Sequence, residues 1–367
     1  MTYLNVDEID SALQNLASAY PTAATLVDVP NRTHDGREGV VLRIGSAPAD
    51  APGVLLLGGM HAREWVPPDA LVSLAADLLE AYDRGTGLRY GGLSFGVGDI
   101  RRLVETMNLY IYACVNPDGR RFSQTSEPMW RKNRRRNDGG CIGVDLNRNF
   151  DFLWDHSAKF APDSGVRTSA DPCDHDVYRG PSPASEPETR NVVSLMDGDP
   201  RIRWLVDVHS AVPVILHSWG SDQNQTTECA QNFGNDAFDG VRGRRNDAVY
   251  REYIPQPDLD NVVALSTVLD DAIAGVRGGR YGAEQAYGLY PTSGASDDYA
   301  FSRHFADPAR AKVYGFCIEC GSSFQPTWSE AEQVIREVSA GLIAFCLAAQ
   351  QHTPVTGPEE MVENTIR

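Results

Sequence analysis

Short apolar segments alternate along this chain with longer segments whose apolar residues recur at helical spacing. The short segments predict strands, and they are Val54–Leu57, Asn108–Val115, Ile202–Val208, Val214–His217 and Lys312–Ile318. The longer segments predict helices, and they are Pro67–Tyr82, Glu186–Met196, Leu259–Val276 and Ser329–Ala349. Strands that alternate with helices build layered α/β folds around a largely parallel or mixed sheet. We therefore expect a ligand site beyond the carboxyl ends of the strands.

The chain has 367 residues, and neither a repeat nor a Ser/Gly linker divides it. We expect one domain over residues 1–352 and a polar tail over residues 353–367. The net charge of −17 excludes general attraction to nucleic acid or to an anionic membrane. No apolar run reaches the ~18 residues that a membrane span needs. The first residues lack the basic and apolar segments of a signal peptide, so we expect a cytoplasmic protein; the alternative is a secreted protein whose leader was removed.

A candidate metal site follows the first predicted strand. His61 and Glu64 lie three residues apart, so a single turn of backbone can aim both at one point. Imidazole and carboxylate suit Zn²⁺, although an isolated His-x-x-Glu pair is more often solvated. His209 ends another apolar strand and offers a third ligand; a buried core histidine is the plain alternative. Two histidines, one glutamate and an open position are typical of a catalytic zinc site.

Further polar groups follow strands and turns. The basic run 130–136 stands out in an acidic chain, although a solvated loop would also explain it. Asn147 and Arg148 pair an amide with a guanidinium, whose planar fork binds a carboxylate through two hydrogen bonds. Glu319 ends an apolar strand, where a buried charge is costly unless it has a partner or a catalytic role.

Taken together, these segments resemble the zinc carboxypeptidases of the digestive carboxypeptidase A and B type, from about Tyr3 to about Leu347. The shared motifs are His-x-x-Glu-Trp, Asn-Pro-Asp-Gly, Trp-Arg-Lys, Asp-x-Asn-Arg-Asn, a strand ending in His-Ser, Tyr-x-x-Ser-Gly-x-Ser-x-Asp, and Phe-x-x-Glu. The resemblance implies one α/β domain with a twisted, mixed sheet of about eight strands flanked by helices. It also implies one zinc ion per chain and a peptide or peptide-like substrate with a free C-terminal carboxylate.

The same resemblance implies the catalytic groups. His61, Glu64 and His209 would hold zinc. Glu319 would be the general base that takes a proton from water and returns it to the leaving amine. Arg131 would polarise the scissile carbonyl and stabilise the oxyanion.

The resemblance also implies how substrate is bound. Asn147, Arg148 and Tyr290 would bind the terminal carboxylate, which predicts exopeptidase action because only a chain end offers that group. Asp297 would lie at the base of the pocket for the last side chain. In the family an acidic residue there accompanies Lys or Arg termini, so we expect a basic preference. The alternative is that Asp297 pairs internally, for example with Arg303, and leaves a mixed pocket.

Some segments depart from the family pattern. Ala211 stands where the digestive enzymes have Tyr, so the next substrate residue would be recognised differently. Cys141 and Cys173 fall where the family often carries a disulfide, and in a reducing cytosol we expect thiols. The glycine-rich segment Gly85–Asp99 looks like an inserted mobile loop.

The sequence thus favours a zinc metallocarboxypeptidase. One alternative keeps the fold and changes the substrate, as a zinc amidase or deacylase acting on a specialised small amide or biosynthetic intermediate. Another is a non-catalytic peptide-binding module, whose signature would be loss of the base or of a zinc ligand. The intact run from Trp130 to Lys132 and the loop at Tyr290 favour the peptidase.

Overall fold

The computed structural model describes residues 2–48, 50–245 and 247–354; the predicted tail lies outside them from residue 355 onward. Eight strands form one mixed sheet in the order β1-β2-β6-β3-β7-β12-β8-β11, which confirms the predicted fold class. These strands are β1 (Ala24–Val27), β2 (Val41–Ile44), β3 (Gly53–Gly58), β6 (Asn108–Tyr112), β7 (Ile202–His209), β8 (Val214–His217), β11 (Ala283–Gln285) and β12 (Tyr314–Glu319).

The centre of the sheet is parallel. Strands β6, β3, β7 and β12 are neighbours that run in the same direction, whereas β2 and β8 pair antiparallel to β6 and β12 on either side. Every residue of β3 is buried, as expected for a parallel strand covered on both faces. The carboxyl ends of the four central strands therefore meet at one edge of the sheet.

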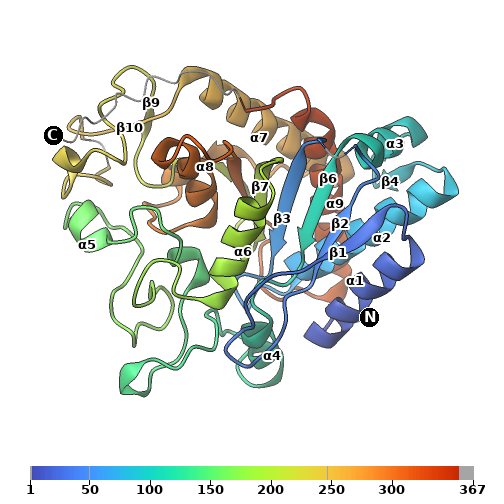
Figure 1. Cartoon of the computed structure of the whole chain (residues 1–367), viewed down its shortest axis with the longest axis horizontal. Helices are drawn as coiled ribbons and strands as arrows, with labels where there is room; N and C mark the ends of the chain where they lie inside the picture. The colour runs from blue at the N-terminus through green and yellow to red at the C-terminus, as the bar shows by residue number, and fades with distance from the viewer. Residues whose placement is uncertain (1, 49, 246, 355–367) are drawn as a thin grey trace.

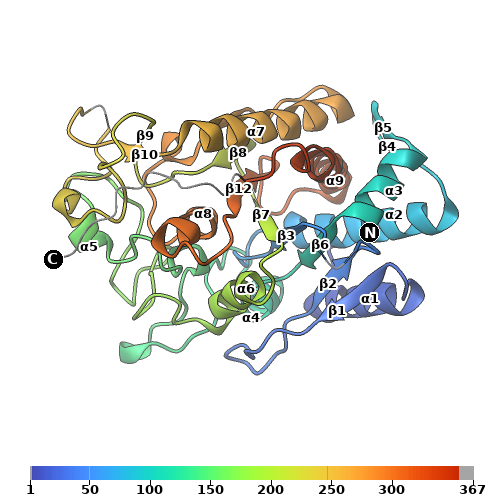
Figure 2. The ribbon, with the colours of Figure 1, turned by 45° about the horizontal axis from the view of Figure 1, so that its top comes forward.

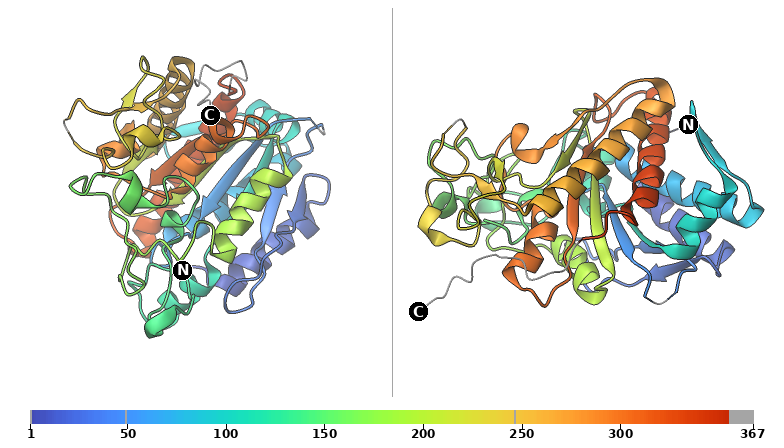
Figure 3. Two further views of the ribbon diagram at one scale, coloured as in Figure 1. Left: turned by 60° about the vertical axis from the view of Figure 1, so that its left-hand side comes forward. Right: turned by 90° about the horizontal axis from the view of Figure 1, so that it is seen from above.

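Helices cover both faces of this sheet. They are α1 (Val6–Ala19), α2 (Val66–Arg84), α3 (Val97–Thr106), α4 (Pro117–Thr125), α5 (His156–Lys159), α6 (Pro187–Gly198), α7 (Gln256–Arg277), α8 (Ser296–Ala306) and α9 (Trp328–Ala349). Figure 1 shows α6 in front of β7 and β3, with α2 and α9 behind the sheet. Helices α7 and α9 pack side by side (Figure 2), and the twist of the sheet between the two layers is visible in Figure 3.

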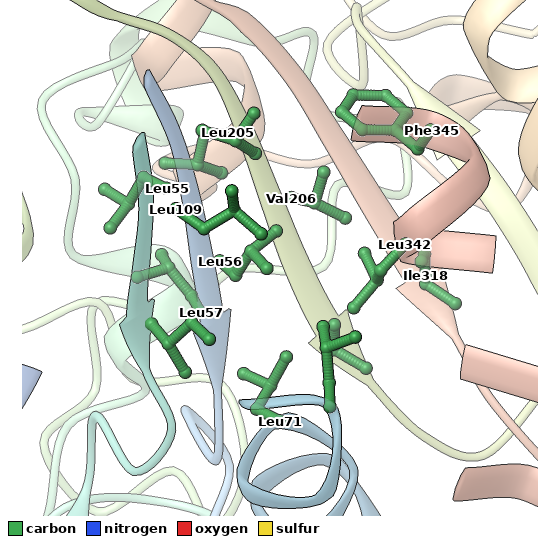
Figure 4. Packing of buried hydrophobic residues seen from close by; sticks show 14 of the residues in the cluster. Leu55, Leu56, Leu57, Leu71, Leu109, Leu205, Val206, Ile318, Leu342 and Phe345 are labelled. Carbon is green, nitrogen blue, oxygen red and sulfur yellow. The ribbon is translucent and has the colours of Figure 1, made fainter. Parts of the chain in front are cut away.

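The core lies where the central strands meet the helices. Leu56 of β3, Leu71 of α2 and Leu342 of α9 belong to one buried cluster (Figure 4). Phe345 of α9 packs edge-on against Phe316 of β12, with ring centroids 5.0 Å apart. This packing fixes the strand ends from which the candidate site is built.

The glycine-rich segment that we expected to be an inserted loop is a hairpin followed by a helix. Its strands are β4 (Leu88–Tyr90) and β5 (Leu93–Phe95), and α3 follows directly. Tyr90 is buried, and its hydroxyl donates to Asp77 Oδ2 at 2.7 Å. Gly91 has φ +57°, and a Cβ there would lie 2.0 Å from the Val276 carbonyl oxygen. At this position glycine allows a close backbone approach at a tight turn.

A second, smaller pair of strands and several single turns complete the described chain. The strands are β9 (Asn224–Gln225) and β10 (Glu252–Tyr253), which run parallel. The single turns are 3₁₀ helices at Asp138–Gly140, Leu146–Arg148, Asp236–Phe238 and Ala286–Gly288. The second of them presents Asn147 and Arg148 beside the sheet edge.

Candidate active site

Four of the predicted residues lie at the carboxyl ends of three neighbouring parallel strands. His61 and Glu64 follow β3, His209 is the last residue of β7, and Glu319 is the last residue of β12. Between β3 and α2 the chain turns at Gly59, whose φ is +65° and where a Cβ would lie 2.8 Å from the Pro68 ring. This turn brings His61 and Glu64 back across the strand ends.

The two histidines and Glu64 converge on one point. His61 Nδ1 lies 2.8 Å from Glu64 Oε1, and His209 Nδ1 lies 3.1 Å from Glu64 Oε2. The two Nδ1 atoms lie 3.0 Å from each other. All three side chains are at least 97% buried. Two ring nitrogens that face each other beside a carboxylate form a donor set that suits a zinc ion, so these residues fit the metal that the sequence predicts.

Charge at this centre is strongly coupled. Burial alone would raise the pKa of Glu64, but the adjacent His61 and His209 rings hold it well below its usual range. Burial would lower the pKa of His209, but the carboxylates of Asp207 and Glu64 raise it well above its ordinary value. The centre therefore favours a carboxylate surrounded by positive charge, which a bound cation would also supply.

Each histidine has a second carboxylate at its outer nitrogen. His61 Nε2 lies 3.1 Å from Asp145 Oδ1, and His209 Nε2 lies 3.0 Å from Asp207 Oδ2. Carboxylates in this position fix the tautomer and orientation of a metal-binding imidazole. Sequence reasoning did not single out either one, although Asp145 lies within the Asp-x-Asn-Arg-Asn motif and Asp207 stands two residues before His209.

A second group with metal-binding chemistry, His34, Glu186 and Glu188, lies elsewhere. The oxygens of Glu186 accept hydrogen bonds from Asn133 Nδ2 at 2.7 Å and Arg135 Nη1 at 3.1 Å. A guanidinium at this distance opposes a cation, so this cluster is a hydrogen-bonded network.

Glu319 sits beside the candidate metal centre without belonging to it. Burial and the nearby Glu64 carboxylate raise its pKa to about 7. It lines a cavity of about 240 Å³ that also contains Glu64, Arg131, Arg148 and Tyr290. A carboxyl group that titrates near neutral pH beside an open cavity suits general-base chemistry.

Arg131 is held by Asp145. Its Nε and Nη2 atoms donate to Asp145 Oδ2 at 3.1 and 2.9 Å, and its Nη1 lies 4.0 Å from Glu64 Oε1. Burial would lower the pKa of Arg131, but the Asp145 and Glu64 carboxylates raise it. Its guanidinium is thus a fixed positive charge on the wall of the cavity.

Arg148 offers a second fixed charge. It is only 2% exposed, and its Nε donates to the Arg167 carbonyl oxygen at 2.6 Å. Its Nη1 donates to the Asn147 carbonyl oxygen, and among the described residues no carboxylate lies within ion-pair distance of this guanidinium. Asn147 lies next to it, and its Oδ1 accepts from Ser296 N at 2.8 Å, which leaves the Nδ2 amide to donate. Arg148 and Asn147 together form a candidate anion-binding site.

Residues that sequence reasoning did not single out also line the cavity. The guanidinium of Arg63 stacks 4.5 Å from the Phe324 ring centroid, and both residues reach the cavity. Ala211, which the sequence did single out, lines it as well. Arg63 lies inside the His-x-x-Glu-Trp motif, so its position next to Glu64 could have predicted that it lies near the site.

Asp297 lies in the first turn of α8 and is 5% exposed. Burial raises its pKa, and the negative charge of Asp207 adds to this. The internal pairing with Arg303 that we considered is absent, because Arg303 Nη2 contacts Asp197 instead. Nearby, Cys317 packs with Leu216 in a small apolar cluster outside the main core.

Cys141 and Cys173 form a disulfide, so the expectation that they stay as thiols is wrong for this structure. The loop that carries Cys173 also carries Asp176, which lines the cavity. The bridge thus restrains one wall of the candidate site. Within the described residues, no helix is both long and apolar enough to cross a bilayer.

The zinc carboxypeptidase family matches residues 9–341, nearly the whole chain. This chain belongs to that family. Carboxypeptidase B of Astacus astacus is 29% identical over 306 residues, which covers 82% of each chain. Carboxypeptidase A2 of Mus musculus is 32% identical over 236 residues, covering 62% of this chain and 51% of the mouse protein. As a zinc carboxypeptidase, the chain is a hydrolase of peptide bonds whose relatives carry both A and B names.

Solved structures agree on the fold. Bovine thrombin-activatable fibrinolysis inhibitor, in complex with tick carboxypeptidase inhibitor, superposes with a TM-score of 0.72 at 19% identity, covering 95% of this chain and 98% of that one. Carboxypeptidase A from Helicoverpa armigera gives a TM-score of 0.69 at 24% identity and covers 95% and 75% of the two chains. At these identities the likeness concerns the fold alone.

Proposed function

We propose that this protein is a zinc-dependent carboxypeptidase that removes one C-terminal residue at a time and prefers Lys or Arg. His61, Glu64 and His209 hold the metal. When bound, zinc supplies Lewis-acid activation of water and of the substrate carbonyl. The buried, convergent donor set supports this assignment.

The side chains of this chain then carry out the proton transfers and the charge stabilisation. Glu319 accepts a proton from the attacking water, because its raised pKa makes it a competent base near neutral pH. It passes that proton to the leaving nitrogen. Arg131, held in place by Asp145, stabilises negative charge that develops on the carbonyl oxygen.

The observation that carries exopeptidase action is the buried guanidinium of Arg148, which lines the same cavity as Glu319 and has no carboxylate partner among the described residues. A terminal carboxylate can form an ion pair with it, whereas an internal peptide bond would leave its charge buried without a counter-charge. The Asn147 amide adds a donor, and Tyr290 lines the same cavity.

The preference for basic residues rests on Asp297. Its carboxyl group is buried and, within the described residues, has no Lys or Arg within ion-pair distance. A cationic substrate side chain would supply the missing partner. The Cys141–Cys173 disulfide further supports a protein that works in an oxidising compartment rather than in the cytosol.

Release of the last amino acid from matched short peptides ending in Arg, Lys, Phe, Leu or Glu tests these proposals. Each peptide is compared with its C-terminal amide, and each reaction is run with zinc and with a chelator. We expect chelator-sensitive release of Arg and Lys above Phe, and little release from the amides. Preference for Phe or Leu would contradict the role of Asp297 alone. Zinc binding without release from any peptide would favour a zinc amidase or deacylase with a specialised small substrate.

A further inference from the structure

We propose that Asp207 is a positioning residue that orients the metal ligand His209, and that Ser296 holds Asp207 in place for this task. The inference rests on the zinc site proposed above. It adds a contact path that links the metal ligand to a residue of the proposed carboxylate-binding site.

Asp207 and His209 lie two residues apart on β7, so their side chains project from the same face of the sheet. Asp207 Oδ2 lies 3.0 Å from His209 Nε2. Within the described part of the chain, Nε2 meets no hydrogen-bond geometry, and the Asp207 carboxylate is the group that it faces at ion-pair distance. A carboxylate at this nitrogen favours the tautomer with its proton on Nε2 and its lone pair on Nδ1, the atom that faces Glu64.

The surroundings of Asp207 indicate that its buried carboxylate lowers the stability of the fold. Its side chain is fully buried, and its Oδ1 atom has no hydrogen-bond partner among the described residues. Its neighbours across the sheet are Leu57 on β3 and Cys317 on β12. A buried carboxylate with an unpaired oxygen destabilises a fold unless a positive partner compensates it. An imidazole that ligates a cation is such a partner.

Ser296 binds the same Asp207 oxygen that faces His209. Its hydroxyl donates to Asp207 Oδ2 at 2.6 Å, and its backbone N–H donates to Asn147 Oδ1 at 2.8 Å. The start of α8 packs closely against β12, because a Cβ built on Gly315 would lie only 2.1 Å from the Asp297 carbonyl oxygen. This close approach leaves the start of α8 little room to shift. Contacts therefore run from Asn147 through Ser296 and Asp207 to His209.

The test compares Asp207→Ala, Asp207→Asn and Ser296→Ala with wild type. Zinc affinity is measured by competition with a chromogenic chelator, and cobalt-substituted protein is examined by visible absorption. We expect about 10–100-fold weaker zinc binding and a changed cobalt spectrum for Asp207→Ala. Smaller losses are expected for Asp207→Asn, whose amide oxygen still accepts, and for Ser296→Ala.

A double variant isolates the route of the effect. Because Ser296 acts through Asp207, adding Ser296→Ala to Asp207→Ala is expected to weaken zinc binding no further. Glu252→Gln is the matched control, since it removes another fully buried carboxylate that also has an unpartnered oxygen. Its zinc affinity and cobalt spectrum should equal those of wild type.

Zinc affinity within twofold of wild type in folded Asp207→Ala, with an unchanged cobalt spectrum, would overturn the proposal. If that variant does not fold, the same result in Asp207→Asn together with Ser296→Ala overturns it. Failure of the zinc site itself would look different. Wild type would then bind less than one equivalent of zinc, or the His209→Ala variant would bind zinc as tightly as wild type.

Discussion

Glu319 lies directly opposite His209 across the parallel pair of strands β12 and β7. The strand register places the two side chains on the same face of the sheet. Cys317 and Asp207, two residues earlier on each strand, form the preceding pair on that face. A candidate base and a candidate metal ligand are thus held by adjacent backbone hydrogen bonds rather than by mobile loops. Such rigidity preserves the distance between the two groups, on which proton transfer depends.

Replacing Glu319 by Gln should remove the base and keep the metal. Positioned general bases typically contribute 10²–10⁴-fold, so we expect kcat/KM for an Arg-terminated peptide to fall by about that factor. Zinc content, measured by atomic absorption, should remain at one equivalent. Activity within tenfold of wild type would show that another group takes the proton.

The pH dependence of kcat/KM should carry the signature of Glu319. Only the ionised carboxylate accepts a proton, so activity is lost as the pH falls through its pKa. Burial and Glu64 raise that pKa to about 7 in the metal-free protein, and a bound cation would lower it. We therefore expect an acidic limb with a midpoint between about 4.3 and 7. Peptide release measured from pH 4 to 9 checks this, and a midpoint above 7 would contradict it.

Arg148→Ala should weaken recognition of the chain end specifically. Hydrogen bonds to charged groups contribute about 1.5–3 kcal/mol, which corresponds to about 10–150-fold in kcat/KM. The loss is expected for peptides with a free carboxylate and should be much smaller for the slow hydrolysis of their amides. Equal losses on both substrates would indicate a folding defect or a role apart from the carboxylate.

The sequence predicted the parts of the site that depend on local pattern. His209 and Glu319 were found because each ends an apolar strand, and parallel strands bring such ends together. Asp297 was assigned a role through the family resemblance, but no local pattern predicted that α8 starts at Ser296 and places the residue in a first helical turn. The pairing of Arg303 with Asp197 of α6 joins residues 106 positions apart, which no local pattern encodes. The Asp207 contact was missed because strand alternation shows which face a residue shares, not which atom it meets.

Asp297→Asn should reduce the preference for basic termini. A neutral amide offers no ion pair to Lys or Arg, so the ratio of kcat/KM for Arg over Phe should fall at least about tenfold. Asp298→Asn is the matched control. Both Asp298 oxygens lie within 3.0 Å of Gly220 N, and burial together with Asp297 raises its pKa well above the ordinary value. Because the Asp298 carboxyl is bound to the Gly220 N–H, its replacement should leave the ratio unchanged.

Glu252→Gln should stabilise the protein at high pH but not at low pH. Glu252 is fully buried on β10, where its Oε2 accepts from Ser221 and Tyr250 and its Oε1 has no described partner. Burial raises its pKa to about 7. Because the folded state binds the proton more tightly than the unfolded chain, wild type loses stability as the pH rises from about 4.5 to 7. The full shift corresponds to about 3 kcal/mol, an upper bound on what the variant recovers at pH 8. Urea unfolding at pH 5 and pH 8 measures this difference, and equal effects at both pH values would contradict it.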